Sequence, residues 1–479
     1  MHRRKFLLLS LAAAASPATA QEPFRLKIAL KPGLSGNAIA PDFTGLSYES
    51  AVLSDPTFFA PANAGLIGLF RNLGTTGVLR IGGNTSEYAV WTRDGGDYSE
   101  TLDPHGPDLG EAAPKKRPVT PLAIQNLRAF ADATGWPVIY GLNLGTAAPD
   151  TVADEAAYVA QTLGPKLVGF QLGNEPDLFS HNGLRTGTYD FADYAAEWRL
   201  FANAVCARVP DARFGGPDAA GNHAWPENFA WQFRDALKFL SHHYYAGGPP
   251  SNPSVTVENL LTWIGPQTDW LGQMIARMRA IAPALPFRLT EMNSCYGGGK
   301  PGVSNTFASA LWGAEAMYLL AAAGASGVNF HGGGYGVYSP IVGTRVTGFS
   351  ARPLYYGMLM FAAAGPGRLV PAEMEGKAPS VSVYGLKSAD GSMKAALFNK
   401  SESSDAIVTL DPGTGAQIAR LSHLTAPALA STGDVTFAGA AVGSDGAWTP
   451  AAPEIVRSND GAFTFTLPGP GAVLCTFAA

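Results

Sequence analysis

Between residues 40 and 348 the chain alternates short apolar runs with longer segments in which apolar residues recur at helical spacing. This alternation is typical of a parallel sheet whose strands are joined by crossover helices. Eight parallel strands with intervening helices close most naturally into a (β/α)8 barrel, in which catalytic side chains lie at the carboxyl ends of the strands. A doubly wound sheet is the structural alternative, although no Gly-rich phosphate-binding motif follows the first run. The eight runs stand at residues 43–48, 77–81, 137–144, 167–172, 213–217, 239–243, 287–290 and 327–331.

A different pattern begins after Gly365, where short strands of alternating apolar and polar residues are separated by Gly, Pro, Ser and Asp. This pattern predicts an antiparallel β-sandwich. Residues 24–30 alternate in the same way, and we expect them to pair into that sandwich. The fold class is thus α/β: a sandwich strand over residues 21–35, a TIM barrel over 36–355 and the main sandwich over 365–479. The sandwich strands are expected at residues 380–386, 394–399, 406–410, 462–467 and 472–477.

The first twenty residues have the three parts of an export signal. A basic start, Arg3-Arg4-Lys5, precedes an apolar stretch over residues 6–15, and small residues lead to Ala20. The apolar stretch is shorter than the roughly 20 residues of a membrane-spanning helix, which favours a cleaved leader over an anchor. Because the paired arginines resemble a twin-arginine signal, we expect export to the periplasm or the exterior of a bacterium.

The charge balance narrows the class of partner. Once the three cations of the leader are removed, 30 Lys and Arg oppose 38 Asp and Glu, a net charge of −8. Nucleic acids and long polyanions are bound by broad basic surfaces, so neither is expected as a partner. Three scattered cysteines, Cys206, Cys295 and Cys475, are too few for a disulfide framework or a zinc cage. We therefore expect no nucleic-acid or membrane partner and no cofactor.

One connection is too long for an ordinary turn between a strand and a helix. Residues 91–118 are rich in Gly, Asp and Pro and follow the second predicted barrel strand. Long loops on a barrel rim are usually functional lids or disordered segments. The aromatic residues Trp91 and Tyr98 favour a lid, which would close one end of a groove and leave a pocket rather than an open cleft.

Two acidic motifs follow predicted strands of the barrel. Gln-Leu-Gly-Asn-Glu-Pro at 171–176 places Glu175 after the fourth strand, and Leu-Thr-Glu-Met-Asn at 289–293 places Glu291 after the seventh. A barrel brings both to the same rim, although they are 116 positions apart. In a retaining glycosidase one carboxylic acid protonates the leaving oxygen, and a second carboxylate about 5 Å away attacks the anomeric carbon. We expect Glu175 to be the acid/base and Glu291 to be the nucleophile.

Residues beside the two glutamates support this prediction. The amide of Asn174 can hydrogen-bond the sugar 2-OH, and Pro176 is expected to end the strand. The alternatives are an exposed Asn-Glu-Pro turn and, for Glu291, a carboxylate that begins a helix. Asn293 and the glycine triplet at 297–299 instead favour a loop that folds over a ligand with accessible backbone N–H groups.

The run Ser-His-His-Tyr-Tyr at 241–245 ends the sixth strand, which lies next to the strand that carries Glu291. A phenol at this position, assigned to Tyr245, can hydrogen-bond the nucleophile and keep it ionised. The adjacent histidines are compatible with a metal site, but no third ligand stands at a suitable spacing. We therefore expect no metal.

Motifs in the same order along nearly the whole chain resemble glycoside hydrolase family 79, which holds β-glucuronidases and heparanases. Residues 91–118 and much of the C-terminal sandwich have no recognisable counterpart. The matching motifs are Gly-Leu-Ser-Tyr-Glu at 45–49 with Asp55-Pro56, Leu-Arg-Ile-Gly-Gly-Asn at 79–84, Leu-Gly-Asn-Glu-Pro at 172–176, His-His-Tyr-Tyr at 242–245, and Glu291 followed by Tyr-Gly-Gly-Gly at 296–299.

This resemblance implies retaining hydrolysis of β-linked glucuronic acid by a (β/α)8 barrel with a β-sandwich. It implies that Glu49 binds sugar hydroxyls, and that Asn84 contacts the substrate where the mammalian heparanases carry threonine. It also implies recognition of the sugar carboxylate by the loop and by a tyrosine after the eighth strand, namely Tyr296, Gly297, Gly298 and Tyr338. Such neutral donors can hold a carboxylate without an arginine.

Several alternatives stay open at this level. Tyr335 competes with Tyr338 for the carboxylate, although Pro340 would rigidify the turn after Tyr338. An exo-acting β-glucuronidase is the leading hypothesis, and an endo-acting, heparanase-like enzyme is its nearest competitor. A hydrolase of neutral sugars, such as a xylosidase, would not need the tyrosines, and a non-catalytic glycan-binding protein would not need both glutamates.

Overall fold

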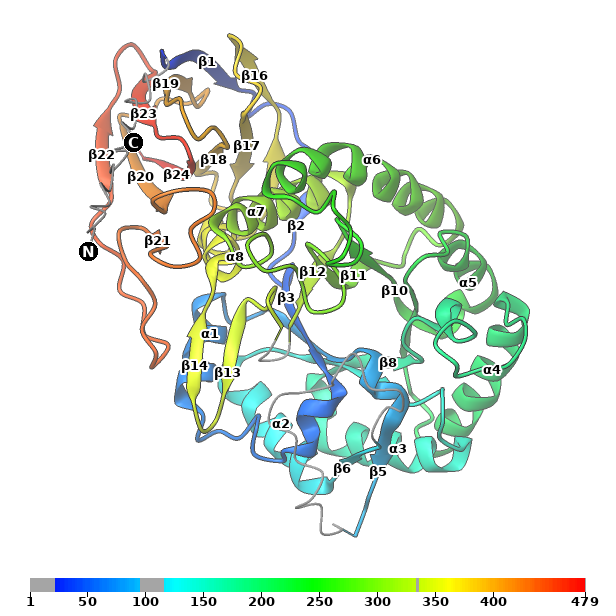
Figure 1. The fold of residues 1–479 in the computed structure, drawn as a ribbon. Helices are drawn as coiled ribbons and strands as arrows, with labels where there is room; N and C mark the ends of the chain where they lie inside the picture. The colour runs from blue at the N-terminus through cyan, green and yellow to red at the C-terminus, as the bar shows by residue number, and fades with distance from the viewer. Residues whose placement is uncertain (1–21, 95–115, 333–335, 479) are drawn as a thin grey trace, which may run out of the picture.

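The computed structural model describes residues 22–94, 116–332 and 336–478. Eight parallel strands close into a barrel, as the alternating pattern predicts, with the order β10-β11-β12-β3-β4-β7-β8-β9. The helices lie outside this barrel (Figure 1). The strands are β3 (Thr44–Glu49), β4 (Val78–Gly82), β7 (Val138–Leu142), β8 (Leu167–Leu172), β9 (Phe214–Ala219), β10 (Leu237–Tyr245), β11 (Phe287–Asn293) and β12 (Gly327–His331).

Strand ends differ from the predictions where polar residues are paired inside the barrel. β11 was expected to end at Thr290, but it continues to Asn293, so Glu291 lies within the strand and begins no helix. β10 continues two residues beyond the predicted end, to Tyr245. Both extensions are explained by their mutual register, which pairs His243 with Glu291 and Tyr245 with Asn293. The sequence pattern did not predict these extensions, because most of the added residues carry polar groups and an apolar pattern reports burial rather than backbone hydrogen bonding.

The barrel helices begin and end at recognisable signals. Thr120 caps α2 by accepting a hydrogen bond from the Ala123 N–H, and Gly135 ends that helix in the left-handed conformation. Asp190 and Asp193 form a reciprocal capping box at α4. The helices are α1 (Ala64–Asn72), α2 (Pro121–Thr134), α3 (Pro149–Leu163), α4 (Phe191–Arg208), α5 (Trp225–Phe233), α6 (Val257–Ile281), α7 (Phe307–Ala323) and α8 (Pro353–Ala364). The last helix thus runs past residue 355, the barrel boundary expected from the sequence.

A β-sandwich packs beside the barrel (Figure 1). Its smaller sheet has the order β16-β1-β19-β23, and its larger sheet has the order β2-β15-β17-β18-β24-β20-β21, with β22 pairing β20. Most neighbours are antiparallel, but β1 and β19 run parallel. The smaller sheet contains β16 (Ala372–Glu375), β1 (Phe24–Leu30), β19 (Ala406–Asp411) and β23 (Phe463–Leu467), and the larger contains β2 (Ala38–Ile39), β15 (Gly367–Val370), β17 (Val381–Lys387), β18 (Met393–Asn399), β24 (Gly471–Ala478), β20 (Ile418–Thr425), β21 (Thr436–Phe437) and β22 (Glu454–Arg457).

The larger sheet is buried on both faces. Along β18, Ala395 and Leu397 belong to the core between the two sheets, whereas Ala396 and Phe398 belong to the core shared with the barrel helices. Because successive side chains of a strand point to opposite faces, one sheet serves both cores. Helices α7 and α8 are buried on nearly all sides, because the barrel strands cover one side of each helix and the sandwich covers the other.

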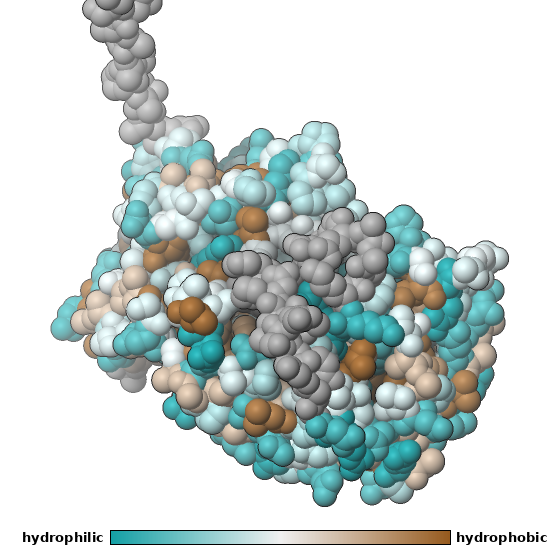
Figure 2. Space-filling model, turned by 60° about the horizontal axis from the view of Figure 1, so that its bottom comes forward, coloured by the Kyte–Doolittle hydropathy of each residue, from teal (hydrophilic) through white to brown (hydrophobic). Residues whose placement is uncertain are grey.

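The outer surface is polar, with apolar residues scattered singly on the face that Figure 2 shows. Such isolated residues are normal on a folded protein. In the described part of the chain, no helix combines the length and the apolar character needed to cross a membrane. The leader over residues 1–20 lies outside the described residues.

Two short strands, β5 (Ala89–Trp91) and β6 (Arg117–Val119), pair in parallel at the base of the long connection. The indole of Trp91 donates a 2.8 Å hydrogen bond to Asp154 on α3. The predicted lid itself falls on residues 95–115, which include Tyr98 and lie outside the described residues.

Candidate active site

Glu175 stands on a sharp turn at the carboxyl end of β8. The strand ends at Leu172 rather than at Pro176, because Gly173 and Glu175 both adopt left-handed backbone conformations, with φ of 85° and 50°. Pro176 instead begins the short 3-10 helix η4 (Pro176–Leu178). A left-handed conformation is uncommon outside glycine, and the backbone N–H of Glu175 stabilises it by donating to the Asp218 carbonyl at 3.0 Å. The turn directs the Glu175 carboxyl toward the barrel axis.

Glu291 lies in β11, where both of its carboxylate oxygens accept strong hydrogen bonds. Arg80 donates to Oε2 at 2.7 Å, and the hydroxyl of Tyr245 donates to Oε1 at 2.6 Å. The ring of His331 also lies 3.7 Å from Oε2. The contact with Tyr245 is the one expected from the position of that residue beside β11.

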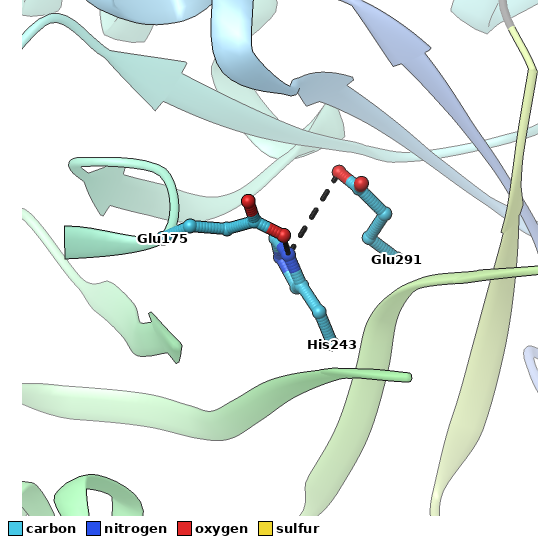
Figure 3. Close-up of side chains that lie close together, drawn as sticks. All are labelled: Glu175, His243 and Glu291. Carbon is cyan, nitrogen blue, oxygen red and sulfur yellow. Dashed lines mark hydrogen bonds and ion pairs between the residues drawn. The ribbon is translucent and has the colours of Figure 1, made fainter. Parts of the chain in front are cut away.

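His243 lies between the two glutamates. Its Nδ1 is 2.9 Å from Glu175 Oε1 and 4.0 Å from Glu291 Oε2 (Figure 3). One oxygen from each carboxylate and one ring nitrogen of His243 all lie within 4.8 Å of one another. Retaining glycosidases hold their carboxyl groups at a similar separation, about 5 to 5.5 Å, whereas inverting enzymes leave room for a water between them.

The two carboxyl groups have opposite pKa shifts. Burial would raise the pKa of Glu291, but the charges of His331, His243 and Arg80 and the Tyr245 hydrogen bond outweigh it and lower that pKa to about 2. Burial also raises the pKa of Glu175, and there the contact with His243 offsets only part of the effect. Glu291 is therefore ionised at neutral pH, as a nucleophile must be, and Glu175 is the group that more readily holds a proton.

Arg80 occupies the centre of the polar cluster. Besides Glu291, its guanidinium donates to Asn174 Oδ1 at 2.7 Å and to Asp218 Oδ2 at 2.6 Å. It is only 1% exposed, so these bonds replace water entirely. A planar guanidinium with five donors suits this shared position, where lysine would offer one point charge.

Two glycines at the end of β4 make room for the cluster. A Cβ on Gly82 would lie 2.5 Å from Cζ of Arg80, and a Cβ on Gly83, whose φ is +76°, would lie 2.3 Å from a carboxylate oxygen of Glu49. Glu49 ends β3 and accepts hydrogen bonds from the N–H and the hydroxyl of Thr85. Its other oxygen lies 3.3 Å from His331.

Asn174 is held on three sides. Its amide donates to Asn84 Oδ1 at 3.0 Å, its own Oδ1 accepts from Arg80, and its backbone N–H donates to Glu87 at 2.6 Å. Glu87 is buried, and burial raises its pKa to about 7 against the opposing backbone hydrogen bonds of Asn174 and Gly145. Asn84 is exposed at the rim, where a substrate can reach it.

The predicted carboxylate-binding residues gather around Tyr245. The rings of Tyr296 and Tyr338 have their centroids 6.1 and 6.2 Å from the ring of Tyr245. Tyr338 is buried, whereas Tyr296 is 47% exposed at the mouth of the site. Gly297 and Gly298 have left-handed backbones, with φ of 67° and 84°, that fold the loop back toward Tyr338. The competing residue Tyr335 lies outside the described residues.

The loop is anchored through its glycines. The carbonyl of Gly298 accepts backbone hydrogen bonds from Val337 at 2.6 Å and Tyr338 at 3.2 Å. A Cβ on Gly299 would lie 2.8 Å from the backbone nitrogen of Tyr338, so only glycine permits this approach. Arg352 fixes the other side by donating to the carbonyls of Gly336 and Val337.

Within the described ranges, three side chains of metal-ligand type lie close enough together to hold an ion. They are Glu175, His243 and Glu291. A histidine that binds a metal ion must do so as a neutral imidazole. Burial would lower the pKa of His243, but the charges of Glu291 and Asp218, the short contact with Asp218 and the hydrogen bond to Glu175 raise it to about 10. His243 is therefore an imidazolium that already serves both carboxylates, which suits proton chemistry better than a metal.

The sequence did not reveal four of the charged residues that define the site: Arg80, Asp218, His243 and His331. Arg80 and His243 lie inside motifs that carry the family resemblance, which was a usable signal. Asp218 and His331 carry no such signal, because their roles depend on distances between β9, β10, β11 and β12.

Sequence comparisons relate the chain to enzymes of one family. Residues 383–474 match the glycosyl hydrolase family 79 C-terminal beta domain, although this part of the sequence showed no recognisable motif. A β-glucuronidase of Aspergillus niger is 29% identical over 365 residues, which is 68% of this chain and 62% of that protein. A β-glucuronidase of Neurospora crassa is 28% identical over 60% of this chain and 56% of its own length. Mouse heparanase is 23% identical, with coverages of 60% and 61%. The chain spans less than two thirds of the length of each of these relatives.

Solved structures show the same architecture. A 4-O-α-L-rhamnosyl-β-D-glucuronidase from Fusarium oxysporum superimposes with a TM-score of 0.78 at 20% identity, covering 94% of this chain and all of that one. The GH51 arabinofuranosidase of Xanthomonas axonopodis pv. citri superimposes with a TM-score of 0.69 at 16% identity, covering 95% of this chain and all of that one. At these identities the likeness concerns the fold. The sequence comparisons, rather than the superpositions, confirm the resemblance found in the motifs: the chain is a relative of the β-glucuronidases and heparanases, and its residues 383–474 match the C-terminal beta domain of glycosyl hydrolase family 79.

Proposed function

We propose that the chain is a retaining exo-β-glucuronidase that releases terminal β-linked glucuronic acid in two displacement steps. The observation that carries this proposal is the buried pair Glu175 and Glu291, whose pKa values are shifted in opposite directions while their oxygens lie within 4.8 Å. Two carboxyl groups driven apart in this way are assigned to acid and nucleophile by their surroundings.

In the first step Glu291 attacks the anomeric carbon while Glu175 gives its proton to the leaving oxygen. Arg80 and Tyr245 keep Glu291 ionised before the attack. As Glu291 becomes an ester its charge is lost, and the proton that leaves Glu175 creates a carboxylate beside His243. The negative charge thus moves between two oxygens that share the same imidazolium.

In the second step water attacks the glycosyl ester, and Glu175 removes its proton. Asn174 supports both steps, because its amide side chain lies between Asn84 and Arg80 at the edge of the sugar site. Its amide is expected to bind the sugar 2-OH, a contact that strengthens as the oxocarbenium-like transition state forms.

The acidic sugar is proposed to bind at the tyrosine cluster. The rings of Tyr296 and Tyr338 both lie close to Tyr245. Gly297 and Gly298 follow Tyr296, and the Gly298 carbonyl accepts the backbone N–H of Tyr338. Phenols and backbone N–H groups bind a carboxylate without adding a second arginine beside Arg80. The β-glucuronidases among the relatives support the choice of a glucuronide over a neutral glycoside.

The test compares aryl β-glucuronide with aryl β-glucoside as substrates for the purified protein, with ¹H NMR of the first-formed sugar anomer. We expect hydrolysis of the glucuronide at a much higher kcat/KM and initial release of the β anomer. A preference for the glucoside would refute the assigned substrate, and initial release of the α anomer would refute the retaining mechanism.

Heparanase relatives keep an endo-acting enzyme as the second candidate. A glucuronate-containing oligosaccharide separates the two modes, because an exo enzyme releases single sugars from the start. Early internal fragments would favour endo cleavage. The acidic net charge of the chain favours neutral or short glycans over sulfated polymers.

Export to the periplasm or the medium is part of the proposal and rests on the basic and apolar start of the sequence. Fractionation of cells that express the whole chain, with N-terminal sequencing of the product, tests it. A cytoplasmic protein that keeps Met1 would refute export.

A further inference from the structure

Asp218 is a further buried carboxylate at the candidate active site, and the reaction steps above give it no part. It lies near the end of β9 in a left-handed conformation, with φ of 59°, and is fully buried. Gln171 donates to Oδ1 at 2.5 Å, and the hydroxyl of Thr290 donates to the same oxygen. Oδ2 forms an ion pair with the guanidinium of Arg80 at 2.6 Å. Side chains from β4, β8 and β11 therefore hold the carboxylate of Asp218, which lies on β9, in one orientation.

The second partner of Asp218 Oδ2 is His243, whose Nε2 lies 3.2 Å away. This contact has ion-pair distance but lies outside hydrogen-bond geometry, since Nε2 is counted among the buried nitrogens without a hydrogen bond. The opposite nitrogen, Nδ1, meets Glu175 at 2.9 Å. The imidazole thus stands directly between a permanent carboxylate and the acid/base carboxyl.

We propose that Asp218 is a positioning residue that holds His243 as an imidazolium against Glu175, so that Glu175 can deliver its proton and remain stable as a carboxylate. The inference rests on the proposed function, because it assigns Asp218 a role in the same reaction. Asp218 touches no substrate and acts through His243.

The charges around His243 support this role. The groups that face it are Glu175 from the turn after β8, Asp218 from β9 and Glu291 from β11, with His242 beside it on its own strand. Arg80 from β4 contacts Asp218 and Glu291, and Tyr245 contacts Glu291. Arg80 forms ion pairs with both Asp218 and Glu291, and these two negative charges reduce its repulsion of the imidazolium. Burial would raise the pKa of Asp218, but Arg80 and His243 lower it well below its usual range.

The proton balance is simple. In the first step the O–H bond of Glu175 breaks and the proton joins the leaving oxygen, while His243 keeps both ring protons and stabilises the new carboxylate. In the second step a proton from the attacking water returns to Glu175. The imidazolium therefore needs a permanent counter-charge that does not titrate during the cycle, and Asp218 provides it.

The test measures the basic limb of the pH profile of kcat/KM, which reports the loss of the Glu175 proton. With Asp218→Asn, His243 becomes neutral at working pH and no longer lowers the pKa of Glu175. The basic limb should move upward by about one pH unit or more. His243→Gln should move it in the same direction, and the double variant should move it no further than His243→Gln alone. Asp132→Asn, a change at an exposed Arg128 partner, is the matched control.

Nitrogen-15 NMR of the histidine rings gives a readout independent of catalysis. We expect His243 to be doubly protonated at pH 8 in the natural chain and neutral in Asp218→Asn. An imidazolium that persists in Asp218→Asn, or an unmoved basic limb in His243→Gln, overturns the inference even if Asp218→Asn does not fold. If the protein hydrolyses no glucuronide, the proposed function fails while the NMR result still decides whether Asp218 sets the charge of His243.

Discussion

Glu175 and Glu291 are buried to nearly the same degree, with exposures of 8% and 5%, yet their pKa values move in opposite directions. Glu291 is bound by a guanidinium and a phenol and lies near two histidines, whereas Glu175 contacts one histidine and lies near the carboxylates of Glu291 and Asp177. Equal desolvation combined with unequal numbers of cationic neighbours therefore separates a carboxyl group that holds a proton from one that is ionised, as the proposed roles of acid and nucleophile require. Burial alone would have made both carboxyl groups acids.

The same comparison explains why the two sides of the site are built differently. Glu291 sits inside a regular strand, so its partners reach it from neighbouring strands of the barrel. Glu175 sits on a left-handed turn after its strand, where neighbours from adjacent strands are fewer. A catalytic base that must gain and lose a proton benefits from fewer fixed cations, since each one favours the ionised form.

The strongest way to break the comparison is to remove the nucleophile. Glu291→Gln keeps the size of the side chain but cannot form the glycosyl ester, so we expect a loss on the order of 10⁵-fold or more on every glucuronide. Steady-state kinetics on substrates with good and poor leaving groups measure this. Equal loss on both classes supports the assignment, and rescue of this variant by azide with an α-configured product would reverse it.

Removing the acid should affect only part of the reaction. For Glu175→Ala we expect losses of about 10² to 10⁴-fold on substrates with poor leaving groups and much smaller losses on activated aryl glucuronides. Added azide should restore rate and yield a β-configured glycosyl azide, because the nucleophile is intact. Absence of any dependence on leaving group would contradict the acid role.

Arg80→Met would make the two sides more alike by removing the cation that donates a hydrogen bond to Glu291. We expect the free energy of unfolding to fall by about 3 to 5 kcal/mol at pH 7, since two buried carboxylates lose their partner. Because the pKa of Glu291 is lowered to about 2 in the folded chain, its ionisation stabilises the native state above its usual value of 4.5, and that contribution disappears as pH falls through 2. Urea unfolding and the acidic limb of kcat/KM measure both effects. The limb should move to higher pH.

Substitutions of Tyr296 and Tyr338 keep both glutamates and test the binding of the sugar carboxylate separately from the catalytic pair. Tyr338→Phe or Tyr296→Phe is expected to weaken transition-state binding of the glucuronide by about 1.5 to 3 kcal/mol, because a donor to a charged group is lost. The glucoside should be affected much less, and Tyr158→Phe on the outer surface serves as control. Equal losses on both sugars would show that these hydroxyls do not bind the sugar carboxylate.

The smallest effect is expected at the rim. Asn84→Ala removes the acceptor for the Asn174 amide, a neutral hydrogen bond that contributes about 1 kcal/mol. We expect a few-fold fall in kcat/KM without a shift in either limb of the pH profile. A shifted limb would mean that Asn84 also controls the charges of the catalytic pair.

Much of the barrel could be predicted, because its evidence is local. Apolar runs such as those of β8 and β12 mark buried strands, and the motif around Glu175 needs only its strand to reach the rim. Predictions were less accurate where polar side chains continue a strand, as at the ends of β10 and β11. There the backbone is held by pairing with a neighbour, which hydropathy does not report.

The sequence by itself determined the order of strands along the chain, the position of the two glutamates on one rim and the glycine-rich loop after Glu291. Tertiary structure alone decided which carboxyl is ionised. That outcome depends on Arg80, Asp218 and His243, which lie up to 163 residues apart in the chain and act within a few ångströms of one another. Coulombic interactions and desolvation depend on distance and burial, and neither quantity exists until the barrel has closed.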